Sequence, residues 1–244
     1  QLSDDILKQE RAALAAQPDK QGLRTFFEHL MRTPKLEIAK VVEQAISSIT
    51  PALEEEPTFS WMKTLDQYYP GDVGVLCPLL LNVMCLQPGE AMFLPAGELH
   101  AYLQGTGLEI MANSDNVLRG GLTPKHVDVP ELLRVLDFTP AADIVVRPES
   151  CSDGEELVYR TPAPEFAVSV LRIDEGNLGH EIDAPTRHDG PQILLCAEGA
   201  ATVHAKTRSV VLERGKAAWV AADDGPIRLS AQEPTRLFRV TVGI

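Results

Sequence analysis

The sequence contains no apolar run long enough to cross a bilayer, and charged residues are spread through its first thirty positions. We therefore expect neither a membrane-spanning helix nor a secretory signal. Basic residues are also scarce, with 22 Lys and Arg against 35 Asp and Glu and a formal net charge of −13. A field of that sign repels nucleic acid and anionic lipid, which argues against both kinds of partner. It still allows a small anionic substrate, because a few basic side chains can dominate the potential inside a cleft.

Cysteine is sparse as well. The four cysteines, at positions 77, 85, 151 and 196, form no C-x-x-C pair, and three of them lie in apolar surroundings. This pattern is typical of reduced thiols that serve as small core side chains in a cytoplasmic protein. It argues against a disulfide framework and against a cysteine-based zinc site.

The first seventy residues predict helices, because apolar residues recur there at three- and four-residue spacings. These positions are Leu23, Phe26, Phe27, Leu30 and Met31, then Ile38, Val42, Ala45 and Ile49. The second of these helices is expected to begin with Thr33 as its N-cap and Pro34 at the first helical position. A third helix is expected from Phe59 to Tyr69, ending before Pro70-Gly71.

From Leu79 onward the pattern predicts short strands and turns as far as about Leu122, with Pro88-Gly89 as a turn signal. A short helical or turn segment, DVPELLRVLDF, comes next, and residues 139–156 are rich in Pro, Ser and Gly and predict a connecting stretch. Six strand candidates follow: FAVSVLRI, QILLCAEG, ATVHAK, SVVLE, AAWVAA and RLFRVTV. Their spacing predicts an all-β sandwich or jelly roll.

A weak internal repeat connects the two β regions. LQPGEAMFLPAG (86–97) resembles LERGKAAWVAAD (212–223) at matching offsets, with a strand, a glycine turn and a second strand. The repeat suggests two related β modules. The second copy has Ala221 in place of Pro95 and Pro226 in place of His100, so it cannot do what His100 does.

The stretch AMFLPAGELHAYLQG (91–105) contains the first candidate for chemistry. A Pro-x-Gly kink follows a strand-like run, and His100 comes three residues after Gly97. This spacing is similar to the second metal motif of cupins, whose histidine points into the barrel mouth and ligates a metal. Taken alone, the spacing leaves open an ordinary hydrogen-bonded histidine.

The residues that follow, HAYLQGTGLEIMANSDNVLRGGLTPKHVDVPELL (100–133), closely resemble the signature region of type I mannose-6-phosphate isomerases. The resemblance is strong over residues 78–138, fair in the helical part and weak in the last ninety residues. It implies reversible conversion of mannose 6-phosphate to fructose 6-phosphate at a zinc site. In that reaction a proton moves between C1 and C2 of the open-chain sugar through a cis-enediol(ate), whose negative charge a Lewis acid or fixed cation stabilises.

The resemblance also implies roles for single residues. Arg119 corresponds to the arginine that faces the sugar, where its charge suits the enediolate or the phosphate; an ion pair with Asp115 is the alternative. Glu109 corresponds to an acid of the pocket that moves a proton or orients a ligand. Tyr102 is expected to share the face of His100 and to contact substrate. Lys125 is expected to bind the phosphate, with a solvated surface lysine as the alternative.

For the metal, the resemblance makes His100 the family's last zinc ligand. The other ligands of the family are a Gln-x-His pair and a Glu, both upstream of the helical region, and this sequence contains no Gln-x-His. Catalytic zinc takes three or four protein ligands, so one imidazole is not a zinc site. We therefore expect the remaining ligands upstream of Gln1. The remaining histidines are expected to bind no metal; they are His29, His126, His180, His188 and His204.

These expectations combine into a mixed, mainly β fold with a helical domain and cupin-like jelly-roll modules, the first of them incomplete. The expected domains are a helical domain (1–70), the C-terminal part of the catalytic barrel (71–138), a connector (139–156) and a second module without metal (157–244). The chain is expected to be an inactive fragment of a cytoplasmic isomerase, completed by a missing N-terminal segment of the same protein. The alternative is a metal-free, cupin-like sugar-binding or assembly module without catalysis.

Overall fold

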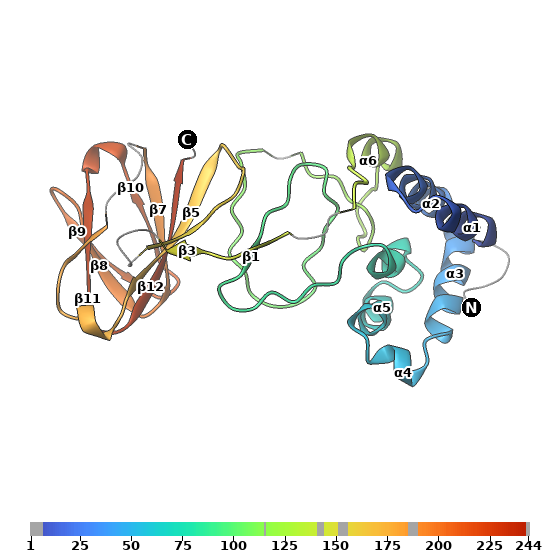
Figure 1. Cartoon of the computed structure of the whole chain (residues 1–244), viewed down its shortest axis with the longest axis horizontal. Coiled ribbons are helices and arrows are strands. Elements are labelled where there is room, and N and C mark those ends of the chain that lie inside the picture. The colour runs from blue at the N-terminus through green and yellow to red at the C-terminus, as the bar shows by residue number, and fades with distance from the viewer. Residues whose placement is uncertain (1–6, 115, 141–143, 151–155, 185–189, 243–244) are drawn as a thin grey trace. The chain divides into compact units, whose positions relative to one another are not determined.

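The computed structural model describes residues 7–114, 116–140, 144–150, 156–184 and 190–242 (Figure 1). The chain forms two compact units. The first contains residues 1–85, 94–105 and 115–143, and the second contains residues 86–93, 106–114 and 144–244. Within the described ranges, no helix has the length and apolar character needed to cross a membrane.

Helices dominate the first unit. They are α1 (Lys8–Ala16), α2 (Lys20–Arg32), α3 (Lys35–Ser47), α4 (Pro51–Glu54), α5 (Pro57–Tyr68), the 3₁₀ helix η1 (Val73–Leu79) and α6 (Val129–Val135). The three helices predicted from apolar periodicity are confirmed as α2, α3 and α5. Their apolar faces meet in one core, which buries Phe26, Leu30, Val42 and Met62 among others. Removal of these faces from water is what stabilises helices of this length.

The junction between α2 and α3 corrects the prediction for Thr33. Thr33 does not cap α3; it ends α2, and its amide and hydroxyl both donate to the His29 carbonyl, at 3.0 and 2.7 Å. A hydroxyl that bonds back to the preceding turn cannot reach forward to cap the next helix. Pro34 therefore takes the N-cap position of α3. By contrast, α2 begins with Asp19, whose carboxylate accepts the amides of Gln21 and Gly22.

A second, smaller cluster in the first unit lies between α2 and α6. Phe27, Leu132 and Leu133 are buried at its centre. Partly buried residues from loops pack against them, among them Leu99 and Leu118. We call this group the α2–α6 cluster. It anchors the two loops that contain His100 and Arg119.

The strands expected between Leu79 and Leu122 are mostly absent from the described part of that range. Only β1 (Ala91–Met92) forms there, and it pairs antiparallel with β2 (Val145–Val146). A strand needs a neighbour for its backbone amides and carbonyls, and the other strand-like runs have no ladder partner among the described residues. These runs therefore join no sheet within the described part of the chain.

The two copies of the internal repeat share their turn. Gly89 and Gly215 both have a positive φ, of 91° and 80°. In each copy the residue after the glycine donates its amide to the carbonyl three residues earlier, at 2.9 Å. Glycine suits both positions because it enters this region of φ without a Cβ clash.

Besides the β1–β2 pair, the second unit contains a sandwich of two antiparallel sheets (Figure 1). Its strands are β3 (Glu149–Ser150), β4 (Glu156–Tyr159), β5 (Phe166–Ile173), β6 (Ile182–Ala184), β7 (Gln192–Glu198), β8 (Ala200–His204), β9 (Ser209–Glu213), β10 (Ala217–Val220), β11 (Ile227–Ala231) and β12 (Thr235–Val242). One sheet has the order β10-β7-β12-β5-β4-β3 and the other has β6-β11-β8-β9. All six predicted strands are present, so the expected fold class is confirmed. The sequence did not predict β3, β4, β6 and β11, and β3 lies within the stretch 139–156 that was expected to be a connector.

Alternate side chains of each sheet point inward and form the core of the sandwich. Arg239 occupies one of these inward positions on β12 and is only 2% exposed. Its guanidinium lies 3.2 Å from the Glu156 carboxylate and donates to the Ala184 carbonyl at 2.9 Å. Ser169 donates to the same carboxylate at 2.5 Å. Each member of this buried ion pair therefore has a hydrogen bond to a further group.

Candidate functional site

The Pro-x-Gly kink before His100 is tied to the end of α6. Gly97 has a φ of 85°, and a Cβ atom there would lie 2.7 Å from the Val135 carbonyl oxygen. The Asp137 amide donates to the Gly97 carbonyl at 3.0 Å. The positive φ and the close approach require glycine at this position, because a side chain would meet the backbone at the end of α6. The start of the His100 loop is thereby fixed.

The side chain of His100 is exposed, and one ring nitrogen has a defined partner. Nδ1 lies 2.9 Å from the carbonyl oxygen of Glu98. A carbonyl oxygen only accepts, so in the neutral ring Nδ1 carries the proton and Nε2 keeps its lone pair. This is the arrangement by which proteins orient a metal-binding histidine. The Tyr102 ring lies beside it, with centroids 5.9 Å apart and an edge-on geometry.

Glu98 has an altered acidity. Partial burial raises the pKa of its carboxyl, the nearby Asp137 carboxylate raises it further, and His100 lowers it. Burial dominates because it disfavours the charged form of the acid. Two carboxyl groups, those of Glu98 and Asp137, therefore lie near the start of the His100 loop.

Arg119, like His100, directly follows a residue that packs against the α2–α6 cluster. Leu118 packs against that cluster and Arg119, the next residue, is exposed, just as Leu99 packs there and His100 is exposed. The residue after Arg119 is Gly120, and a Cβ atom on it would lie 2.8 Å from Leu99 Cδ1. The two loops are therefore in direct contact, one residue away from each candidate. Arg119 forms no ion pair with another described residue, and Asp115, its alternative partner, lies outside the described residues.

The other two candidates are exposed as well. Lys125 lies in the first unit, and its amide donates to the Thr123 hydroxyl at 3.1 Å in a local turn. Glu109 belongs to the second unit. The structure thus brings together His100, Tyr102 and the Arg119 loop, all in the first unit, and places Glu109 in the other unit.

A complete metal site is not present in the part of the chain that the structure describes. No group of three or more His, Cys, Asp or Glu side chains there could hold a metal ion. His100 has the right tautomer for a ligand, but it does not belong to such a group among the described residues. These residues fit one position of a zinc site and do not fit a whole one.

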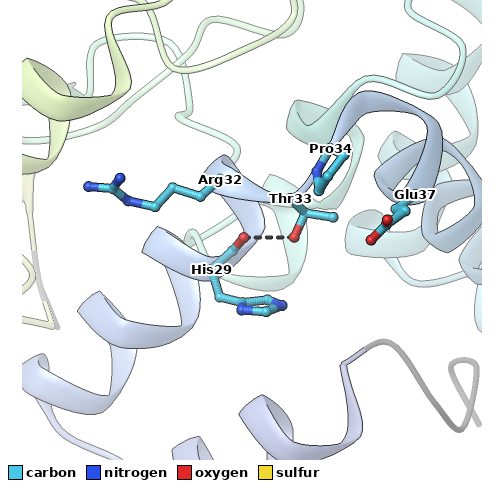
Figure 2. A pocket seen from close by; sticks show the side chains of 5 residues that line it. All are labelled: His29, Arg32, Thr33, Pro34 and Glu37. Atoms are coloured by element: carbon cyan, nitrogen blue, oxygen red, sulfur yellow. Dashed lines mark hydrogen bonds between the residues drawn. The ribbon is translucent and has the colours of Figure 1, made fainter.

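Other histidines have ordinary partners, and one of them lines a pocket. His204 lies 2.9 Å from each of two serine hydroxyls, Ser209 and Ser230, while His188 is outside the described residues. His29 lies 3.4 Å from the Glu10 carboxylate. Figure 2 shows the open pocket of about 360 Å³ that His29 forms with Arg32, Thr33, Pro34 and Glu37 at the α2–α3 junction. None of the candidate catalytic or metal-binding residues lines this pocket.

Sequence reasoning missed the residues that support the site. Leu99, Leu118 and Gly120 decide where His100 and Arg119 lie, and none of them has a polar group. The available signal was an apolar residue directly before each candidate, with glycine after Arg119. An apolar residue before each candidate predicts an anchored loop only when the surface that it packs against, here the α2–α6 cluster, is known.

Comparison with known proteins agrees with these observations. A family model described as the helical insertion domain of type I phosphomannose isomerase matches residues 3–81. The mannose-6-phosphate isomerase of Salmonella typhimurium is 41% identical over 203 residues, which are 81% of this chain and 49% of that protein. The enzyme of Escherichia coli is 37% identical, over 92% of this chain and 55% of its own length.

Solved structures give the same result. The crystal structure of the Salmonella typhimurium mannose 6-phosphate isomerase bound to substrate, fructose 6-phosphate, and zinc superposes with a TM-score of 0.82 at 36% identity. The match covers 97% of this chain and 58% of that one. A zinc-bound form superposes with a TM-score of 0.81. The chain thus spans about half the length of the curated relatives it matches, and it is a homologue of the type I phosphomannose isomerases.

Proposed function

We propose that the protein to which this chain belongs is a mannose-6-phosphate isomerase, and that this chain supplies part of its active site. The observation that carries the proposal is the common anchoring of His100 and Arg119. Each follows a leucine of the α2–α6 cluster, and their loops touch through Leu99 and Gly120. Two exposed polar side chains on touching loops that one apolar cluster anchors are well placed to act on one substrate.

The proposed chemistry needs a fixed positive charge, and Arg119 provides one. Proton transfer between C1 and C2 of the open-chain sugar places negative charge on the sugar oxygens, which a positioned guanidinium stabilises. The Arg119 guanidinium could instead bind the phosphate, which stays on C6 during the whole reaction. We assign Glu109 to proton transfer or to orienting a ligand, and Tyr102 and Lys125 to binding the phosphosugar.

We assign His100 to zinc, through Nε2. Bound zinc would supply a Lewis acid to the sugar oxygens. The hydrogen bond from Nδ1 to the Glu98 carbonyl supports this assignment, because it leaves Nε2 as the acceptor. Since the described residues provide one ligand only, we propose that a further segment of the same protein, upstream of Gln1, provides the others and completes the first β module.

The domain scheme given by the sequence is part of this proposal, with residues 157–244 as a module without metal. The cysteine pattern favours a cytoplasmic protein. The acidic net charge allows a small phosphosugar as substrate, because a few local basic side chains can bind its phosphate.

A second function remains a candidate, a metal-free sugar-binding or assembly module. It is favoured by the lack of a ligand cluster among the described residues. A module of this kind would not require Arg119 and His100 on two touching loops, or the hydrogen bond that leaves His100 Nε2 as an acceptor. Reading the coding frame upstream of Gln1 separates the two: a Gln-x-His pair and a Glu there support the isomerase, and their absence supports the module.

The biochemical test uses the protein encoded by the whole frame. We expect stoichiometric zinc and turnover of mannose 6-phosphate to fructose 6-phosphate. A His100→Ala variant should lose both, while His126→Ala, an exposed histidine of the same unit, should keep both. A protein that binds the phosphosugar without turning it over would overturn the enzyme proposal and favour the module.

A further inference from the structure

Asp72 joins two segments that are far apart in the sequence. It precedes η1, and its Oδ1 atom accepts the amide of Gly74 at 2.7 Å. The same oxygen accepts the amide of Leu122 at 3.0 Å, across fifty residues of chain. Two backbone amides therefore converge on one carboxylate oxygen, which is an acceptor-only group and suits two donors.

The two segments that Asp72 joins, around Gly74 and around Leu122, pack closely against each other. A Cβ atom on Gly74 would lie 2.6 Å from Leu122 Cγ, and one on Gly121 would lie 3.2 Å from the Gly74 backbone. Leu122 has a φ of 51°, a conformation that residues with side chains adopt uncommonly. Such a conformation persists when surrounding contacts determine it, and the hydrogen bond to Asp72 is one of these contacts.

Leu122 comes three residues after Arg119. The loop that contains Arg119 is thus fixed at two points, by Leu99 against Gly120 and by Asp72 on the Leu122 amide. From this geometry we infer that Asp72 is a positioning residue, which holds the Arg119 guanidinium in place for the reaction. The inference rests on the proposed function, since it assumes that Arg119 acts on substrate.

The first test is a double-mutant cycle in the isomerase encoded by the whole frame, with kcat and KM measured separately. Asp72→Ala should lower kcat about tenfold or more, the scale of a misplaced catalytic group. In an Arg119→Ala background the same change should have less than about a twofold effect, because the charge it positions is already gone. Asp72→Asn should retain most of the activity, because its amide oxygen can still accept both amides.

Asp66→Ala is the matched control. Asp66 also accepts a backbone amide, that of Gly71 at 3.2 Å, but it makes no bridge to the Arg119 loop. It should leave kcat within about twofold of the parent. Additive effects of Asp72→Ala and Arg119→Ala would overturn the inference, since a structural role alone predicts them. No effect of Arg119→Ala would instead overturn the role of Arg119 in the proposed function.

The second test needs no substitution and no activity. Hydrogen exchange of this chain should show the Leu122 amide protected relative to the neighbouring Thr123 amide, because the Asp72 carboxylate holds it. Fast exchange at Leu122 would overturn the inference even if Asp72→Ala fails to fold. Protection at Leu122 together with an inactive whole protein would keep the bridge and reject the proposed function.

Discussion

Leu99 and Gly120 are in such close van der Waals contact that a side chain on Gly120 would require the end of the Leu99 side chain to shift. Leu99 Cδ1 lies 2.8 Å from the position that a Cβ atom on Gly120 would occupy. His100 and Arg119 are the immediate neighbours of this pair, so the contact holds the backbone of both loops next to the two candidates.

Gly120→Ala should therefore disturb both stability and catalysis. Leu99 would have to move within the α2–α6 cluster, and overpacking of this kind costs about 1–3 kcal/mol. In an active isomerase we expect kcat/KM to fall about tenfold or more, because the two candidate groups separate. Thermal unfolding and steady-state kinetics measure the two effects. Gly107→Ala is the control, since a Cβ atom there meets no atom within 4 Å and should change neither quantity.

Arg119→Ala should lower kcat about a hundredfold in the active protein, the usual scale for removing a preorganised charge from a developing oxyanion. Zinc content should be unchanged, because arginine is not a ligand. Arg134→Ala serves as control: that arginine is exposed on α6, where it pairs with Glu131. A normal kcat with a raised KM would show that Arg119 only binds the phosphate.

Residues 1–244 expressed alone should bind zinc weakly and should not turn over mannose 6-phosphate. The reason is that the described residues contain no group able to complete a metal site around His100. Metal analysis after dialysis and a coupled assay measure the two properties. Stoichiometric zinc with turnover would contradict the prediction, and the first ligands to test would then be His126 and Glu98.

The described cysteines should differ in reactivity towards a thiol reagent. Cys85 is exposed and should react in the folded chain, whereas Cys196 is buried. Burial raises the pKa of the Cys77 thiol to about 12, with a smaller contribution from Asp72, and burial also raises the pKa of Cys196. Since the thiolate is the reactive form, both should stay unreactive near neutral pH until the chain unfolds. The rate should be measured in a Cys151→Ser background, with Cys85→Ser removing the fast phase.

The raised pKa of the Cys77 thiol also has a consequence for stability. The Cys77 thiol ionises at a lower pH in the unfolded chain, at about 8.5, than in the folded one. Below that pH the thiol is protonated in both states and its burial is harmless; as pH rises towards 12, the unfolded state is increasingly favoured. Cys77→Ala should therefore reduce the loss of stability between about pH 9 and pH 11. An unchanged pH profile in urea unfolding would contradict this.

Arg239→Ala should strongly destabilise the second unit. The substitution leaves the Glu156 carboxylate buried beside Ser169 without its cation, which costs about 3–5 kcal/mol. The exposed pair of Arg160 and Glu149 is the control, and Arg160→Ala should cost at most about 1 kcal/mol. Urea unfolding followed by Trp219 fluorescence measures both. Equal losses for the two variants would show that burial of the Arg239 pair has no special cost.

Local pattern was enough for many of the regular elements. The runs FAVSVLRI and SVVLE coincide with β5 and β9, because short runs of β-branched and other apolar residues favour strands. The helical period placed α2, α3 and α5, since each of these helices buries one face. The motif from His100 to Lys125 likewise identified the candidate residues and the family.

Other features depend on contacts between distant parts of the chain. The strands expected before Leu122 did not form in the described range, because a strand requires a partner that periodicity cannot supply. Thr33 was assigned to the wrong helix because its hydroxyl can bond in either direction along the chain. The closeness of Leu99 to Gly120, and of Asp72 to Leu122, arises only when loops pack onto helices far away in sequence. The residue types were thus readable from the sequence, whereas their positions relative to one another were set by tertiary packing, which no local pattern encodes.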